Sequence, residues 1–311
     1  MSAHPHPDVR ARLAHARRLA WWTLGWMTSI VIVMGLAMGS SQAMKTAWIE
    51  DLLSLIPAIS FLIALRFERR NPDHRFPHGY DRVNSLAFMV SAVALSFFGA
   101  FLLFESAMSL VKQEHVTIPP MTIFGVTIWS GWIMIAALAY SIVPPVILGR
   151  MKVPIARALE DEVLHTDAMM QKADWMTGLA GIAGIIGIGL GLWWADAAAA
   201  GLISFSILKD GIRALKIASA ELVDGAPRKL DSNEVAEDAE ALRGALKQRF
   251  PDAEIRLRET GRYIHAQVVG VVAPEQVDLE EIWPCASDRS WRLAQLSFVP
   301  PEGDARRKAG G

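Results

Sequence analysis

Cysteine is nearly absent from this 311-residue sequence, which has only Cys285. A single cysteine excludes an internal disulfide framework and a CxxC metal or redox motif. An excess of basic residues is also lacking, because 31 Lys and Arg stand against 32 Asp and Glu. Proteins that bind nucleic acid need a basic face for the phosphate backbone, so that class is set aside. The sequence shows no nucleophile paired with a base and no phosphate-binding glycine loop, so we expect neither an enzyme nor a bound cofactor.

Apolar residues are abundant. They make up 52% of the sequence, and the mean hydropathy is +0.27, which is high for a soluble protein of this length. A bilayer core of roughly 30 Å needs about 20 apolar residues per helix. The sequence therefore predicts an all-α bundle of six transmembrane helices, at about residues 21–38, 48–67, 86–111, 123–148, 168–192 and 197–215.

Basic residues are concentrated on one side of these predicted spans. The connection after the fourth span, for example, holds Arg150, Lys152 and Arg157, whereas the opposite side holds only Lys45 and Lys112. Lys and Arg are retained in cytoplasmic connections. We therefore expect a multi-pass protein of the cell inner membrane with both termini in the cytoplasm.

The pattern changes after residues 224–227, where a small cytoplasmic α+β domain is predicted. Its expected elements are a helix at 232–249, strands at 254–259 and 263–272, a short helix at 274–282 and a strand at 291–299. The predicted divisions are a cytoplasmic tail at 1–20, the membrane domain at 21–222, the α+β domain at 223–300 and a disordered tail at 301–311.

Ionisable residues inside predicted spans are functional candidates, because an unpaired charge in lipid is costly. Two helix faces stand out, and together they would offer carboxylates and a thioether to a divalent cation. Methionine at such a position is also a common packing residue. The candidate metal ligands are Glu50, Asp51 and Ser54 in the second helix and Asp167, Met170 and Asp174 in the fifth.

Structural explanations of these acidic residues stay open. Glu50 and Asp51 lie near a helix start, where the water interface and the helix dipole both suit carboxylates. Asp174 has two possible counter-charges in the sequence, Lys172 and Lys209. Either pairing would make Asp174 a structural residue.

A weaker candidate site lies in the connection after the second span. Asp73, His74 and His78 have side chains that bind transition metals. The same stretch is bracketed by proline and glycine and is also typical of an ordinary loop. The sequence does not choose between these interpretations.

Two long runs of residues resemble the cation diffusion facilitator family. The resemblance implies a homodimeric exporter that exchanges a divalent metal ion for protons by alternating access, with a ferredoxin-like cytoplasmic domain that helps it to dimerise. The segments that carry the resemblance are residues 69–82 with 86–87, and residues 164–174 with 194–196, Gly211 and 221–227.

The resemblance also implies ligand positions. Members of the family usually place His or Asp four residues before Asp on both the second and the fifth helix, and the matching positions here are Glu50, Ser54, Met170 and Asp174. An alternative function follows from the replacement of the usual ligands by Ser54 and Met170, namely a metal-responsive or structural membrane protein that has lost transport. A third is transport of another solute, with Lys172 as a counter-charge.

Overall fold

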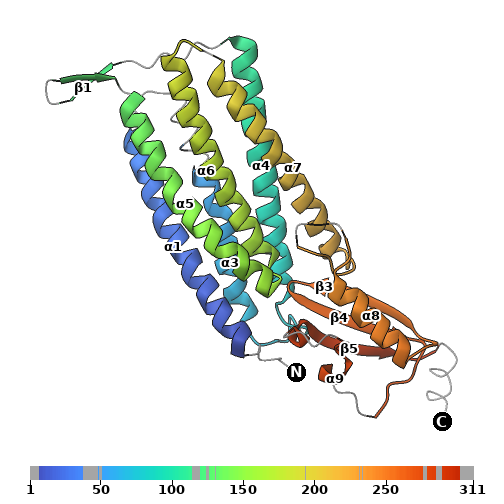
Figure 1. The fold of residues 1–311 in the computed structure, drawn as a ribbon. Coiled ribbons are helices and arrows are strands. Elements are labelled where there is room, and N and C mark those ends of the chain that lie inside the picture. The colour runs from blue at the N-terminus through green and yellow to red at the C-terminus, as the bar shows by residue number, and fades with distance from the viewer. Residues whose placement is uncertain are drawn as a thin grey trace.

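Long helices lie side by side and a small sheet covers one end of them (Figure 1). This computed structural model describes residues 7–37, 48, 51–113, 120–123, 126–129, 131–192, 194–230, 232, 234–275, 279–284 and 289–301. The helices of the bundle are α1 (Pro7–Ala37), α3 (Leu55–Glu68), α4 (Arg82–Lys112), α5 (Gly131–Leu159), α6 (Glu162–Gly189) and α7 (Ala195–Leu222).

Three described helices are long and apolar enough to cross a membrane. They are Val9–Leu36 within α1, then α4 and α5. Helices α6 and α7 have 28 residues each, but α6 carries charged side chains in its first half and α7 carries them mainly in its second half. The predicted membrane helices are therefore confirmed for three segments, and the count of six stays a prediction.

The fourth predicted helix begins later than expected. Strands β1 (Pro120–Ile123) and β2 (Val126–Trp129) pair antiparallel where the sequence analysis began a helix at residue 123, and α5 then continues to Leu159. Pro120 is the first residue of β1, a position that accepts proline in a strand, and β-branched residues in both strands favour pairing. The helix expected from residue 123 therefore begins only at Gly131, and it continues beyond residue 148 to Leu159.

Helices α4 and α7 approach each other at two glycines. A Cβ atom added to Gly99 would lie 2.5 Å from the backbone nitrogen of Leu208, and one added to Gly211 would lie 2.7 Å from the Cα of Ser96. Small residues let helix backbones come this close. The two helices are thus in contact over much of their length, backbone against backbone.

The C-terminal domain has the element order predicted from the sequence. Its sheet has the order β3-β4-β5, with an antiparallel first pair and a parallel second pair. Helix α8 packs on the sheet through Leu242 and Leu246, which lie in one core with Leu257 and Ile264. Likeness to a ferredoxin fold stays a prediction. The elements are α8 (Glu237–Arg249), β3 (Glu254–Thr260), β4 (Tyr263–Val269), α9 (Leu279–Ile282), η1 (Ser290–Arg292) and β5 (Leu293–Val299).

The first turns of α1 and the C-terminal domain lie at the same end of the bundle, and the β1–β2 hairpin lies at the other (Figure 1). We call these the domain end and the hairpin end. This arrangement is the one expected if both termini lie on one side of a membrane, which stays a prediction. Which side that is stays a prediction.

Candidate metal site

Helix α6 carries a polar face directed into the bundle. The helix begins where the Leu164 backbone N–H donates a 2.9 Å hydrogen bond to Asp161 Oδ1, an N-cap contact. Along the helix Asp167, Gln171 and Asp174 follow at intervals of four and three residues, which places them on one face. We call these three residues the α6 polar face.

Asp167 forms an ion pair with Lys152 of α5. Lys152 Nζ lies 2.5 Å from Asp167 Oδ2, and both side chains are fully buried. The sequence analysis placed Lys152 in a connection between spans, and the structure corrects this because α5 continues past it. The sequence analysis therefore missed Lys152 as a member of the site. The signal that could have found it is its position, about one helical turn after the apolar run that ends at residue 148.

Gln171 was also missed, although it lies four residues after Asp167. Its Nε2 donates a 3.1 Å hydrogen bond to Thr23 Oγ1 of α1. Within the described part of the chain, Gln171 Oε1 and Asp167 Oδ1 are buried acceptors without a hydrogen-bond partner. Buried polar atoms are normally satisfied, so these two acceptor oxygens on one helix face mark a place where a cation or a proton donor fits.

Asp174 completes the α6 polar face. Its Oδ2 is shielded from solvent, and its carboxylate is close enough to Lys152 to interact with it electrostatically. One ammonium group therefore lies near two carboxylates of the same helix face. Two carboxylates on one helix face are groups that suit a cationic ligand.

The candidate residues before α3 are only partly described. Glu50 lies outside the described residues. Ser54 is 2% exposed, and its Oγ donates a 2.9 Å hydrogen bond to the backbone oxygen of Asp51. That bond uses the hydroxyl proton and leaves the oxygen lone pairs in place.

Met170 joins α6 to α3. Its side chain is fully buried in an apolar cluster, against which Leu53 and Ile56 pack. The structure therefore brings the helices of the two predicted faces together, with Met170 in the role of a packing residue. Among the residues that the structure describes, no three His, Cys, Asp or Glu side chains are grouped closely enough to hold a metal ion.

The connection after α3 is held by its own aspartate. Asp73 Oδ1 accepts hydrogen bonds from the backbone N–H groups of Arg75 and Phe76, both at 2.8 Å, and Tyr80 Oη donates to Asp73 Oδ2 at 2.6 Å. The hydrogen bond from Tyr80 is the main cause that lowers the Asp73 pKa. His74 is exposed, as is His78. The geometry explains Asp73 as a loop-forming residue.

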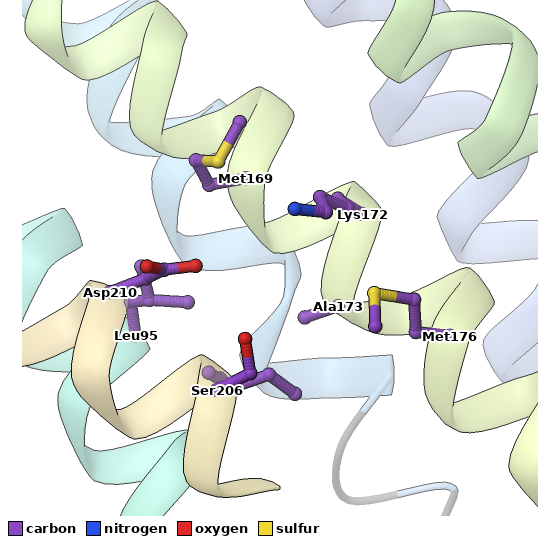
Figure 2. Close-up of a pocket in the computed structure, with 8 residues that line it drawn as sticks. Leu95, Met169, Lys172, Ala173, Met176, Ser206 and Asp210 are labelled. Atoms are coloured by element: carbon purple, nitrogen blue, oxygen red, sulfur yellow. The ribbon is translucent and has the colours of Figure 1, made fainter. Parts of the chain in front are cut away.

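A small cavity lies on the other side of α6, between α4 and α7 (Figure 2). Its volume is about 20 Å³, enough for one water molecule or one small ion. The Lys172 ammonium and the Asp210 carboxylate both point into it, and Met169 and Met176 contribute thioethers. Asp210 also lies 3.6 Å from Arg213, so its charge is shared within α7.

The sequence resembles several characterised or named proteins. Residues 21–223 match the protein family described as the cation efflux transmembrane domain. The chain is 23% identical over 249 residues to the manganese efflux system protein MneS of Bacillus subtilis, and the alignment covers 80% of each protein. It is 29% identical over 182 residues to the zinc transporter ZitB of Yersinia pseudotuberculosis, which covers 57% of this chain and 53% of the relative.

A third relative spans most of both sequences. The chain is 24% identical over 270 residues to a probable cation efflux system protein of Mycobacterium tuberculosis, covering 86% of this chain and 75% of that protein. The family match itself extends from α1 to the end of α7 and so includes the α6 polar face.

Proposed function

Because this chain belongs to the cation efflux family, we propose that it exports a divalent metal cation in exchange for protons, by alternating access at the α6 polar face. Divalent metal efflux is the function of the family scaffold. Proton exchange and the residues that bind the ion are our proposal. The observation that carries it is the set of buried oxygens that Asp167, Gln171 and Asp174 hold in the interior of the bundle.

The residues of the face have different parts in this proposal. Lys152 compensates the charge of Asp167, so Asp167 contributes an oxygen more than a charge. Asp174 is the principal charged ligand, and Asp51 is the charged candidate before α3. Protons compete with metal for such carboxylates, because a ligand must be deprotonated to bind the ion.

The donor atoms favour a particular class of metal. Asp51, Ser54, Gln171 and Asp174 offer oxygen only, and oxygen ligands suit Mn²⁺ better than sulfur- or imidazole-seeking metals. The manganese efflux protein of Bacillus subtilis is among the relatives, as is a zinc transporter. We propose that Mn²⁺ is exported in preference to Zn²⁺, and that Met170 packs the helices without binding the ion.

The setting of transport is also part of the proposal. We place the protein in the cell inner membrane with the domain end in the cytoplasm and propose six spans and a homodimer. The start of α1 and the C-terminal domain lie at the same end of the bundle, which supports placing both on the same side of the membrane (Figure 1). The distribution of basic residues supports the cytoplasm as that side.

Transport is tested with the purified chain in proteoliposomes that carry an imposed pH gradient and are offered Mn²⁺, Zn²⁺, Co²⁺ or Cd²⁺. Flux that needs the gradient and is greatest for Mn²⁺ is the expected result. Asp174→Asn should abolish it, whereas Asp210→Asn, the same change in the cavity on the other side of α6, should leave most of it. Normal flux in the Asp174→Asn protein would overturn the site assignment.

The alternative function is that of a transport-deficient, metal-responsive or structural membrane protein. Two observations favour it, since Ser54 donates to the backbone and Met170 is fully buried among apolar side chains. Metal binding in solution by calorimetry, together with no gradient-driven flux for any of the four ions, would identify this function.

A further inference from the structure

Arg262 of the C-terminal domain lies inside the domain end of the helical bundle. Its side chain is fully buried. One guanidinium nitrogen, Nη1, lies 2.9 and 3.0 Å from the two carboxylate oxygens of Glu68, and the other, Nη2, lies 2.6 Å from Asp161 Oδ2. A planar guanidinium is suited to binding two carboxylates at once.

The two partners of Arg262 belong to the two helices of the candidate site. Glu68 is the last residue of α3, and Asp161 directly precedes α6 and caps its first turn. The N-cap residue Ser54 and the α3 residues Phe61 and Glu68 follow at intervals of seven and so share one face, with Ser54 and Phe61 buried and Glu68 partly buried. Arg262 therefore fills the space between α3 and α6 at the domain end.

The β3–β4 turn holds Arg262 in this position. Gly261 has a φ of +60°, which suits the first position of a two-residue hairpin loop, and an added Cβ atom would lie 3.0 Å from the Asp81 backbone oxygen. The Gly261 N–H donates to Glu221 Oε1 at 2.8 Å and to Ser85 Oγ at 3.1 Å. The turn is thus attached to α4 and α7, while its arginine reaches α3 and α6.

Without Arg262, the carboxylates of Glu68 and Asp161 would push the ends of α3 and α6 apart. The negative charge of Asp161 already opposes ionisation of Glu68 and contributes to raising the Glu68 pKa, although burial is the larger cause. Like charges at short range repel, and water would enter to solvate them. One side chain therefore decides whether the ends of α3 and α6 attract or repel each other.

We propose that Arg262 is a positioning residue for transport, which locks the domain ends of α3 and α6 together and must leave Glu68 and Asp161 before the bundle opens on that side. The lock itself is independent of the ion, while its part in transport rests on the proposed function. In this way the C-terminal domain controls access to the α6 polar face through one arginine side chain.

The lock is tested by the reactivity of a buried thiol. The reporter is Ala64→Cys in a Cys285→Ser background, because Ala64 is fully buried one turn from Glu68. The full chain is placed in nanodiscs and treated with a small membrane-impermeant methanethiosulfonate. Arg262→Met should raise the labelling rate by about tenfold or more, as expected for the loss of a charge-assisted hydrogen bond.

Control variants separate the lock from general damage. Arg256→Met changes an exposed arginine of β3 that pairs with Glu254, and it should leave the rate unchanged. Adding Glu68→Gln and Asp161→Asn to Arg262→Met removes the repulsion and should lower the rate again. Arg262→Lys keeps the positive charge but lacks the planar guanidinium that binds two carboxylates at once, so it should give an intermediate labelling rate. It also provides a second variant if Arg262→Met does not fold.

Two results would overturn the proposal. One is a parental labelling rate in Arg262→Met, and the other is an equal increase in Arg256→Met. Transport measured on the same variants keeps the two proposals apart. If the chain transports no metal but shows the expected labelling pattern, the lock is supported and the proposed function is refuted. If it transports metal but the labelling rate does not change, the proposed function is supported and the lock is refuted.

Discussion

Lys152 Nζ and Asp167 Oδ2 lie 2.5 Å apart with both side chains fully buried, so α5 and α6 are joined by an ion pair inside the bundle. Such a pair is sensitive to the loss of either member, because the remaining charge then has no compensation. The pair also fixes the position of α6 along the axis of α5, and with it the positions of Gln171 and Asp174.

Removal of the Lys152 charge is expected to destabilise the protein strongly. Lys152→Met leaves a buried carboxylate alone and should lower the free energy of unfolding by about 3–5 kcal/mol, whereas Lys152→Met with Asp167→Leu should recover much of the loss. Thermal unfolding in detergent, followed by tryptophan fluorescence, measures both. Lys209→Met, at an exposed position of α7, is the matched control. A double variant no more stable than the single one would contradict the pairing.

Substitutions at Met170 distinguish packing from ligation. Met170→Leu conserves volume and should cost less than about 1.5 kcal/mol, with metal flux retained, whereas Met170→Ala should cost about 2–5 kcal/mol through the cavity it leaves against Leu53 and Ile56. Unfolding and flux are measured on the same preparations. Loss of flux in Met170→Leu with normal stability would mean that the thioether binds the ion.

Ionisation of Glu259 should make the protein less stable as pH rises. Burial, partly opposed by Arg292, raises the Glu259 pKa from 4.5 to about 7. A carboxyl group whose pKa is raised by folding favours the folded state in its protonated form, so its contribution is complete below pH 4.5 and is lost as pH rises to about 7. Thermal midpoints between pH 4 and 8 should fall across this range, and Glu259→Gln should flatten the profile. A midpoint that rises over the same interval in the parent, but not in the variant, would refute the sign.

The α4–α7 contact should not tolerate a methyl group. Gly99→Ala places a Cβ atom against the backbone of Leu208, where no side chain is able to move aside, and should cost about 1–3 kcal/mol or more. Gly25→Ala on α1 has nothing within 4 Å of its added Cβ and should be neutral or stabilising by up to about 1 kcal/mol. Chemical or thermal unfolding compares the two directly. Equal effects would show that helix propensity, and not the close approach, governs both positions.

Features that depend on neighbours in sequence were predictable. The three apolar helices follow from long apolar runs, and the β3–β4 hairpin follows from alternating apolar residues around Gly261. The α6 polar face was visible in part, since Asp167 and Asp174 interrupt a predicted span. Gln171 was not recognised, because a neutral amide gives little signal in a count of charges.

Contacts between distant segments were not predictable in this way. Lys152 and Arg150 lower the local hydropathy and ended the predicted helix early, although the partner that compensates Lys152 lies 15 residues further along. Arg262 is separated from Glu68 by 194 residues and from Asp161 by 101. A buried arginine among soluble-domain strands carries no local pattern that names its partners.

The carboxylate of Asp161 serves two elements at once, because Oδ1 receives the first turn of α6 and Oδ2 receives Arg262. One carboxylate therefore both caps the start of α6, the helix that bears the polar face, and binds the C-terminal domain. A molecule that binds the C-terminal domain and changes its orientation would thus displace the first turn of α6 without entering the lipid.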